Sequence, residues 1–384
     1  MAKARKGNNV TSRLNILLFG APFSGKSTMA MQAAYLKRPD GKPFRVLVFD
    51  TESSGTDEAI EELVRNGVDA ENVYIIYTQS QKEIETYIAK VANNEDFYML
   101  DDDGEETDET VLDADGQPFR ADCIVIDSIS ILKATNQQSL LELSRKRNKI
   151  KAERAGATGD EKFVQVSNAA LELRDYQILG YNAQNFILSL MSCGAHVIMT
   201  AREEDEKVSV KTPDGQIASV ATGKKVYSGL KNADYNCKTI IHMYQDPETN
   251  EICAEVQKDR SKVHELGEVI VDPTLLDYQT VIDGNKGRKD FRIKNTLDTS
   301  VAEDQKIFEQ QMLGADYTTE VQVDTSTDDA AALKAEIKAA VDKLSPPEKK
   351  EMKNKLSAAG LPVAYTKETN VEVLAKILSI VAAD

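Results

Sequence analysis

One stretch of this 384-residue sequence combines residue types and a spacing that suit phosphate chemistry. It reads Gly20-Ala21-Pro22-Phe23-Ser24-Gly25-Lys26-Ser27 and fits the pattern G-x-x-x-x-G-K-[ST]. Glycines let the backbone N–H groups of such a loop turn inward around phosphates, where a side chain would block them. Lys26 can reach the β- and γ-phosphates, and Ser27 can hold Mg²⁺ through its hydroxyl. The stretch predicts a site for ATP and Mg²⁺, with Gly20 to Ser27 and Thr28 as nucleotide-binding residues.

The segments on either side of the loop are those that must position it. An apolar run, Leu14 to Phe19, precedes the loop, and a helical run, Thr28 to Leu36, follows it. This order predicts a strand, a loop and a helix whose positive N-terminal dipole points at the phosphates. The alternative is a chance match to the pattern, which the flanking strand and helix make less frequent.

Two carboxylates follow other apolar runs that predict strands. Arg45 to Phe49 leads into Asp50-Thr51-Glu52, and Cys123 to Ile126 leads into Asp127-Ser128. Open parallel sheets bind ligands at the carboxyl ends of their strands, so both acids should face the phosphate loop. We predict that Asp127 supports the Mg²⁺ ion and that Glu52 activates the attacking water. The alternatives are an ordinary turn aspartate and a solvated glutamate.

Cations for the transition state also have candidates at predicted strand ends. Thr200 and Arg202 follow the strand His196 to Met199 and could sense the γ-phosphate. Lys258 and Arg260 close a strand, Ile252 to Lys258, that should pair with Lys238 to Tyr244. The alternative for this second pair is an exposed cationic strand end.

Composition limits the partners that the chain can have. The formal net charge of −16 means that nucleic acid or an anionic membrane would be attracted only by local basic patches. The four cysteines are dispersed and the three histidines do not cluster, which disfavours zinc, disulfides and a histidine triad. No run approaches a membrane span, and the basic N-terminus leads into polar Asn8-Asn9 rather than an apolar signal core. We therefore expect a cytoplasmic protein.

The pattern along the chain predicts an α/β fold, in which helices flank a mostly parallel sheet. We expect a flexible basic tail over residues 1–13, a core over 14–282, an extension and linker over 283–328, and a small helical domain over 329–384. Residues 95–115 carry eleven acids, so the segment 95–120 is interpreted as an acidic hairpin or loop inserted into the core. The C-terminal domain is predicted from an apolar stripe at helical spacing, formed by Leu333, Ile337, Val341 and Leu344.

A family resemblance rests on the ordered set Gly20–Ser27, Phe49–Glu52, Ile124–Ser128 and Val197–Thr200. This set resembles the ATPase core of RecA-type recombinases, and most of all the compact phage-encoded RecA-like cores described as AAA-family ATPases or single-strand annealing proteins. The resemblance covers roughly residues 14–282 and implies a RecA-like P-loop fold in a homo-oligomer. It also implies that Glu52 activates water, that Asp127 supports Mg²⁺, and that Lys258 and Arg260 act on a neighbouring subunit's nucleotide.

Two polar stretches, after Asp127 and after Thr200, resemble the places where that family carries its DNA-binding loops. Cations there would neutralise phosphates and give salt-sensitive, largely sequence-independent binding of single-stranded DNA. The alternative is that they cover solvated faces. These cations are Arg145, Lys146, Arg147, Lys149 and Lys151 in the first stretch, and Lys207, Lys211, Lys224 and Lys225 in the second.

The leading hypothesis is an ATPase that acts on single-stranded DNA in recombination, annealing or repair, in a host cytoplasm if the chain is phage-encoded. One alternative is a P-loop motor or loader that acts on a replication or packaging protein, with the acidic insertion and the C-terminal helices as docking surfaces. The other is a nucleotide-dependent scaffold without catalysis.

Overall fold

The computed structural model describes most of the chain, as two compact units that divide at residues 296 and 297. The first unit is Met1–Thr296 and the second is Leu297–Asp384. The described residues are 4, 7, 10–53, 55–211, 216–288, 293–313, 333, 334, 336–338, 340, 341, 352, 355, 356, 359, 361, 362 and 371–381.

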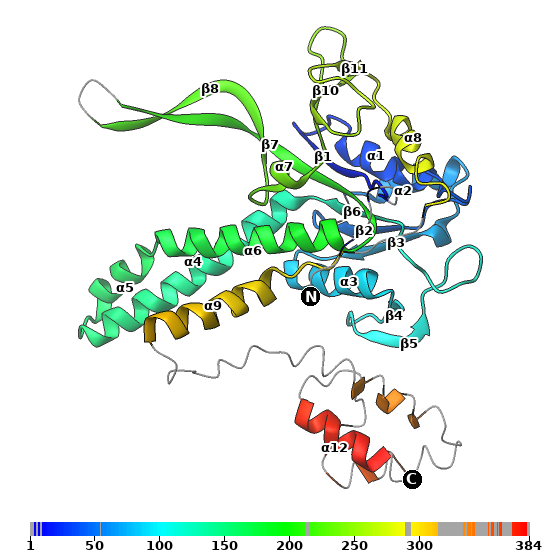
Figure 1. Ribbon diagram of the computed structural model, residues 1–384. Coiled ribbons are helices and arrows are strands. Elements are labelled where there is room, and N and C mark those ends of the chain that lie inside the picture. Colours follow the sequence, from blue (N-terminus) through cyan, green and yellow to red (C-terminus); the bar gives the residue numbers. More distant parts are fainter. Residues whose placement is uncertain are drawn as a thin grey trace. The chain divides into compact units, whose positions relative to one another are not determined.

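A nine-stranded sheet lies at the centre of the first unit (Figure 1). Its order is β11-β10-β9-β1-β7-β6-β2-β3, with β8 paired to β7 alone. The strands that surround the phosphate loop run parallel, whereas β8, β10 and β11 are antiparallel to their neighbours. The strands are β1 (Asn15–Gly20), β2 (Val46–Asp50), β3 (Val73–Tyr77), β6 (Cys123–Asp127), β7 (His196–Lys211), β8 (Ile217–Ser228), β9 (Thr239–Gln245), β10 (Ile252–Asp259) and β11 (Val269–Val271).

Helices cover both faces of this sheet, which is why strands β1, β2 and β6 are buried along their whole length and mostly apolar. Leu17 and Phe19 of β1 pack in one core with α3 (Gln81–Asn93) and the apolar parts of α4 and α6. Ile16 and Leu18 pack in the other core with α1, α2 and α8. The predicted α/β fold with a mostly parallel, helix-flanked sheet is therefore confirmed. The remaining elements of this second core are α1 (Lys26–Met31), η2 (Gln32–Tyr35), α2 (Asp57–Arg65), η3 (Ala70–Asn72), η4 (Leu275–Tyr278) and α8 (Gln279–Asp283).

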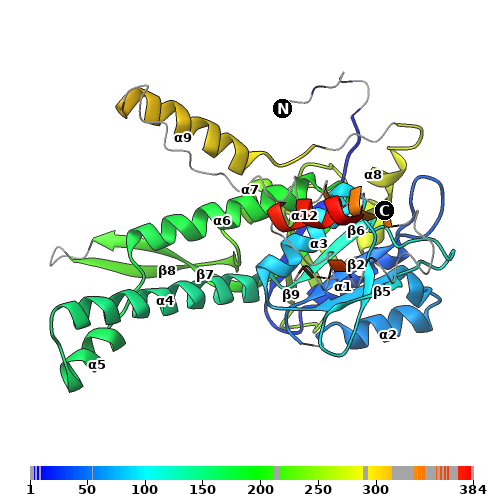
Figure 2. The same cartoon turned by 90° about the horizontal axis from the view of Figure 1, so that it is seen from below.

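Two arms extend from one side of the first unit, as Figures 1 and 2 both show. One arm is helical and consists of α4 (Ile129–Arg154), α5 (Gly159–Ser167) and α6 (Leu173–Ser192). The other is the ribbon formed by the outer parts of β7 and β8, paired as far as Lys211 opposite Ile217. The predicted strand His196 to Met199 was therefore too short, because the polar residues after it pair with β8. The residues 212–215 between the two strands lie outside the described part.

The acidic segment is a small substructure beside the main sheet. Its strands β4 (Tyr98–Leu100) and β5 (Glu106–Thr110) pair antiparallel in a sheet of their own. Phe97 and Phe119 hold its two ends, since both are fully buried and their rings contact each other edge to face. Most of the acids therefore lie on a solvated hairpin whose ends are fixed by aromatic packing, whereas Asp113 is buried outside it.

The N-terminal segment from Val10 to Arg13, assigned to a flexible tail from the sequence, is bound to the core. Asn285 donates to the Ser12 carbonyl (2.6 Å), and the Ser12 N–H donates back to the Asn285 side chain (2.8 Å). Arg288 donates to the Val10 carbonyl (2.5 Å). A short helix, α7 (Ala233–Asn236), completes the described elements of this unit.

The second unit has its own apolar cluster. Helix α12 (Val371–Val381) contributes Leu374, Ile377 and Val381, which pack with Ile337, Met352 and Leu356. Leu333 and Val341 of the predicted stripe pack against this cluster, and Leu344 lies outside the described residues. Helix α9 (Leu297–Leu313) occupies part of the stretch predicted as extension and linker. Residues 314–328 of that linker lie outside the described residues as well. None of the described helices is long and apolar enough to cross a bilayer.

Candidate nucleotide site

The phosphate loop turns tightly against the neighbouring strand β9. Gly20, the last residue of β1, lies so close to β9 that a Cβ on it would stand 1.8 Å from the Met243 carbonyl oxygen. Gly25 takes a left-handed conformation (φ 80°) and begins α1 directly before Lys26. Both glycines of the sequence pattern are thus required by the backbone, one by a close approach and one by its φ angle.

Replacing Gly20 by alanine is expected to lower the free energy of unfolding by about 3 kcal/mol, because the β9 carbonyl that the new Cβ meets is fixed in the sheet. Urea unfolding measures this change. Gly284→Ala is the matched control, since a Cβ there makes only ordinary contacts at 3.5 Å. Equal stability of the two variants would contradict the close approach at Gly20.

Lys26 spans the loop. Its ammonium donates to the Ala21 carbonyl (2.6 Å) and to Ser24 Oγ (3.2 Å), and Ser24 Oγ donates to the same carbonyl (2.8 Å). Burial lowers the pKa of Lys26, and the nearby carboxylates of Asp127, Glu52 and Glu203 partly oppose that shift. A partly desolvated ammonium beside the loop is suited to bind phosphate oxygens.

Asp127 is the carboxylate nearest the start of α1. It is 5% exposed, and it accepts hydrogen bonds from the hydroxyls of Thr200 and Ser27. Burial raises the pKa of Asp127, and the Glu52 and Asp50 charges act in the same direction. The predicted pair Ser27 and Asp127 is therefore brought together. A hydroxyl and a buried carboxylate are oxygen donors that fit Mg²⁺, which when bound would supply positive charge to the β- and γ-phosphates.

Glu52 follows the end of β2, two residues after Asp50. Its Oε1 accepts from Ser128 Oγ (2.8 Å) and from Arg202 Nη2 (3.0 Å). The side chain is 34% exposed, so that one side of the carboxylate is open to water. Glu52 and Arg202, predicted separately, thus form an ion pair.

Two residues to which no role was assigned from the sequence, Asp50 and Thr51, hold this turn in place. Asp50 is buried and accepts from the Glu52 backbone N–H (2.8 Å) and the Thr56 hydroxyl (3.0 Å). Thr51 Oγ1 bonds to both sides of residue 128, accepting from its N–H (2.8 Å) and donating to its carbonyl (3.0 Å). Asp50 and Thr51 lie in the same strand-end run as Glu52, which was the available signal for them.

Thr200 and Arg202 lie inside β7 rather than at its end. Their backbones are in register with Leu18 and Gly20 of β1, so they flank the start of the phosphate loop. Thr200 is fully buried and its hydroxyl is occupied by Asp127, whereas the Arg202 side chain is 60% exposed. Of the two, only Arg202 therefore has a side chain that is accessible from solvent.

Lys258 and Arg260 are not brought to the loop of their own chain. Strand β10 is antiparallel to β9, so its last residues pair with the first residues of β9, at the opposite edge of the sheet. The Lys258 ammonium donates to the carbonyl oxygens of Asp234 (2.6 Å) and Tyr235 (3.2 Å). The parallel strands bring their carboxyl ends to the side of the sheet that carries the phosphate loop, whereas antiparallel β10 ends on the other side.

The nine basic residues of the arms that were singled out from the sequence divide into two groups. Four have an ion-pair partner on the arms: Arg145 with Glu142 (2.5 Å), Arg147 with Asp175 (2.7 Å), Lys151 with Glu172 (3.8 Å) and Lys225 with Asp205 (2.8 Å). Five are exposed and form no ion pair with any described residue: Lys146, Lys149, Lys207, Lys211 and Lys224.

The fold and this site together define the class of the protein. A glycine-rich loop between β1 and α1, a buried carboxylate on β6, and a strand, β7, between the two make it a P-loop nucleotide-binding protein with a RecA-like core. Residues 12–262 match the family model described as an AAA domain, and the chain belongs to that family. The predicted RecA-like P-loop core is thereby confirmed.

Three solved structures are among those that match the chain. The RadB recombinase has 15% sequence identity and a TM-score of 0.36, over 68% of this chain and 87% of that one. A KaiC-like protein from Pyrococcus horikoshii OT3 has 13% identity and a TM-score of 0.33, over 68% and 91%. The flagellar accessory protein FlaH from Methanocaldococcus jannaschii has 13% and 0.33, over 67% and 84%. No curated protein sequence matches the chain.

Proposed function

We propose that this protein hydrolyses ATP at the phosphate loop and uses the reaction to act on single-stranded DNA. The observation that carries the proposal is the convergence of Lys26, the Ser27–Asp127 pair and Glu52 around one loop. These residues supply a phosphate-binding cation, oxygen donors for Mg²⁺, and a base, which are the parts that phosphoryl transfer requires.

In the proposed reaction, water attacks the γ-phosphorus as the bond to the β-phosphate oxygen breaks, and Glu52 accepts the proton of that water. Arg202 controls when this carboxylate is free. Its guanidinium pairs with Glu52 (3.0 Å) at a position in register with Gly20, so the γ-phosphate would compete for it. Arrival of ATP would thus move positive charge from the base to the phosphate that is transferred.

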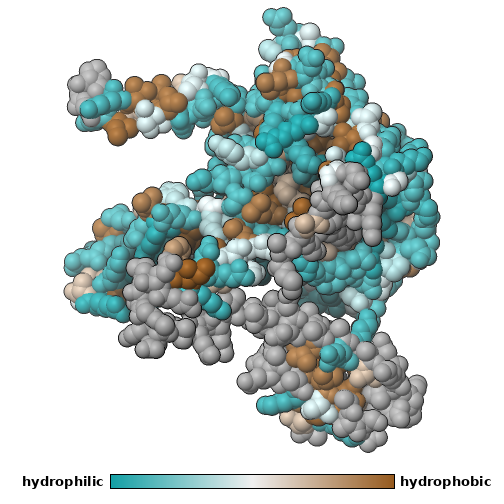
Figure 3. Space-filling view, in the orientation of Figure 1, coloured by the Kyte–Doolittle hydropathy of each residue, from teal (hydrophilic) through white to brown (hydrophobic). Residues whose placement is uncertain are grey.

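The arms are the proposed DNA-binding surface. The five exposed cations without ion pairs lie on α4, β7 and β8, in a chain whose net charge is strongly negative. Exposed aromatic side chains lie on the helical arm, where Phe163 is 72% and Tyr176 53% exposed, and aromatic faces can stack on bases. The ribbon carries exposed apolar side chains, among them Val208 and Val210, and brown patches lie along it in Figure 3.

The arms are continuous with the site in the chain. Helix α4 begins one residue after Ser128, and β7 carries both Arg202 and Lys207. A change in the Glu52–Arg202 pair would therefore act directly on the roots of both arms. We propose that nucleotide state controls DNA binding by this route.

The test is ATP turnover with and without single-stranded DNA, combined with DNA affinity against salt. Replacing Lys146 and Lys149 by alanine should make the slope of log K against log salt less steep by about 1.4, since each phosphate contact on a single strand contributes about 0.7. Lys82→Ala with Arg65→Ala is the control, because it removes equal charge from α2 and α3. If the protein does not bind DNA at low salt, and if DNA does not stimulate ATP turnover, the DNA part of the proposal is wrong.

Further parts of the proposal concern assembly and location. In a homo-oligomer, Lys258 and Arg260 would face the nucleotide of a neighbouring subunit, which explains why they lie away from their own loop. Residues 329–384 would form a helical domain that binds a replication or recombination protein. The four cysteines all lie among the described residues, where they are buried and form no disulfide with one another, which suits a reducing cytoplasm. If DNA has no effect, a motor or loader that acts on such a protein is the function to test next.

A further inference from the structure

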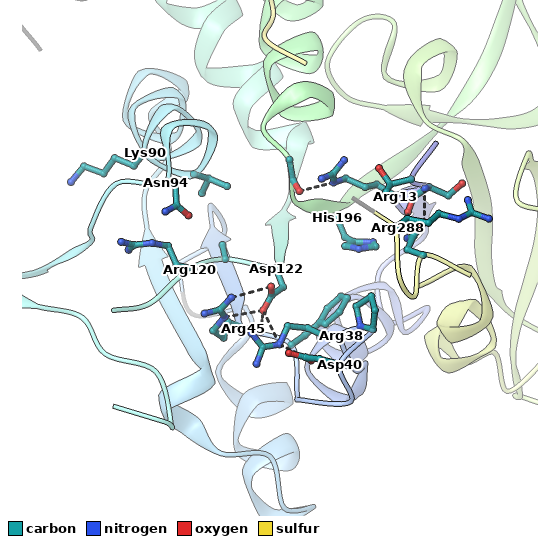
Figure 4. Close-up of a pocket in the computed structure, with 18 of the residues that line it drawn as sticks. Arg13, Arg38, Asp40, Arg45, Lys90, Asn94, Arg120, Asp122, His196 and Arg288 are labelled. Carbon is teal, nitrogen blue, oxygen red and sulfur yellow. Dashed lines mark hydrogen bonds and ion pairs between the residues drawn. The ribbon is translucent and has the colours of Figure 1, made fainter. Parts of the chain in front are cut away.

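A second candidate site lies at the amino ends of the parallel strands, whereas the phosphate loop lies at their carboxyl ends. It is a cavity of about 460 Å³, within the size range of small-molecule sites (Figure 4). Strands β1, β2, β6 and β7 run parallel, so the residues at their amino ends, among them Arg13, Arg45, Asp122 and His196, meet at this edge. The length of a strand, roughly 17–20 Å, separates it from the nucleotide loop.

The charge around this cavity is the reverse of that of the whole chain. Six arginine and lysine residues and three acidic residues line it, whereas the full sequence has 47 basic and 63 acidic residues. Phe44 and Phe97, both 1% exposed, supply a rigid apolar part of its wall.

Three of the six cations are neutralised within the protein. Arg45 pairs with Asp122 (2.9 Å) and Asp113 (3.3 Å). Arg120 pairs with Asp96, and Lys90 pairs with Glu106. These three cations therefore shape the cavity without requiring a ligand.

Arg38 forms only long ion pairs, with Asp40 and Asp122, and Arg288 forms none with a described residue. The Nε of Arg38 is buried and makes no hydrogen bond to a described residue; its nearest carboxylate oxygens, of Asp40 and Asp122, stand 3.6 and 4.0 Å away. The hydrogen bond that Arg288 makes to the Val10 carbonyl satisfies a donor but does not balance the charge. Two guanidinium groups from distant parts of the chain thus border the same space, and neither makes a hydrogen bond to a carboxylate of a described residue.

Two neutral donors border the same space. The Nδ1 of His196 accepts from the Leu14 N–H (3.0 Å), so the neutral ring carries its proton on Nε2. Burial lowers the pKa of His196 to about 3, with the charges of Arg13 and Lys238 acting in the same direction, so the ring stays neutral at physiological pH. Thr11 Oγ1 is buried and has no hydrogen-bond partner among the described residues.

We propose that this cavity binds a small phosphate-bearing anion, with Arg38 and Arg288 as its charged contacts and His196 Nε2–H and the Thr11 hydroxyl as neutral donors. The donors come from four separate segments of the chain. A tetrahedral phosphate offers acceptor oxygens in several directions, whereas a planar carboxylate offers them in one plane, so the arrangement favours phosphate. The site is separate from the nucleotide loop.

The test titrates the full-length protein with inorganic phosphate and with AMP, in a Lys26→Met background that weakens binding at the loop. Affinity is measured by calorimetry. Arg38→Ala should weaken binding by at least about tenfold, and Arg38→Lys by less, since it keeps the charge and loses the fork. Arg65→Ala, which removes an arginine from α2, should leave affinity unchanged. Tighter binding of AMP than of phosphate would assign a nucleotide; equal binding would assign the bare anion.

A second variant protects the test against misfolding. Arg288→Gln keeps a donor for the Val10 carbonyl but removes the charge, and it should also weaken binding by about tenfold. The urea midpoint of each variant shows whether it is folded. The proposal is overturned if the Lys26→Met protein shows no saturable phosphate binding, or if folded Arg38→Ala and Arg288→Gln proteins bind as tightly as the Arg65→Ala control.

Discussion

Replacing Glu52 by glutamine is expected to lower ATP turnover by about 10²–10⁴-fold, the usual contribution of a general base. The amide keeps the shape of the side chain and can still contact Ser128 and Arg202, but it cannot accept a proton from water. Nucleotide affinity should change little, because the contacts to the phosphates come from the loop and Lys26. Phosphate release and nucleotide binding, measured on the same sample, separate these two effects.

The matched control for Glu52→Gln is Ser128→Ala. It removes a 2.8 Å hydrogen bond that orients the Glu52 carboxylate but leaves the carboxylate itself. We expect a fall in turnover of about tenfold, corresponding to one hydrogen bond. If Glu52→Gln retains full turnover, the base lies elsewhere; if neither the parent protein nor the variant hydrolyses ATP, the scaffold hypothesis is favoured.

The parts of the site that could be predicted from sequence are those encoded by contiguous residues. The phosphate loop is one run of eight residues, and its glycines, Lys26 and Ser27 have roles that follow from their order. Asp127 and Glu52 could be found because each directly follows an apolar run, and parallel strands bring their carboxyl ends together. Their convergence needs only the rule for parallel sheets, not knowledge of particular contacts.

The parts that could not be predicted depend on pairing between distant segments. The acidic run after Arg202 indicates a loop when taken alone, and it is a strand only because β8 pairs with it. Lys258 ends a strand and was therefore a candidate for its own nucleotide site or for a neighbouring subunit's, and the antiparallel direction of β10 places it away from its own loop. Arg202 and Glu52 are 150 residues apart, and nothing in either segment indicates that they form an ion pair.

The N-terminal segment was misjudged for a similar reason. Residues 10–13 are polar and basic, which is typical of a solvated tail, yet Asn285 and Arg288 bind their backbone carbonyls. Hydrogen bonds to backbone atoms leave no trace in the composition of the segment that accepts them. The cavity that these residues help to enclose was therefore also absent from the sequence analysis.

The second large effect is expected from Lys26→Met, which keeps most of the side-chain length and removes the charge. Nucleotide affinity should fall by about 10–100-fold, because a charge-assisted hydrogen bond to phosphate is lost in a partly buried site. Turnover should fall below detection, because the charge that develops on the transferred phosphate loses its nearest cation. Titration with a fluorescent ATP analogue measures the affinity.

The pH dependence of ATP binding gives an independent check on Lys26. Burial lowers the pKa of its ammonium, while bound phosphates would favour the protonated form. ATP affinity should therefore be highest below the lowered pKa of Lys26 and fall as the pH rises through that pKa. This fall should occur at a lower pH than the pKa of an ordinary lysine would give. The Lys26→Met protein should not show this fall, whereas Lys82→Met, which alters an exposed lysine of α3, should retain it. If affinity falls with pH equally in all three proteins, the titrating group is not Lys26, and the loop lysine does not hold the phosphates as proposed.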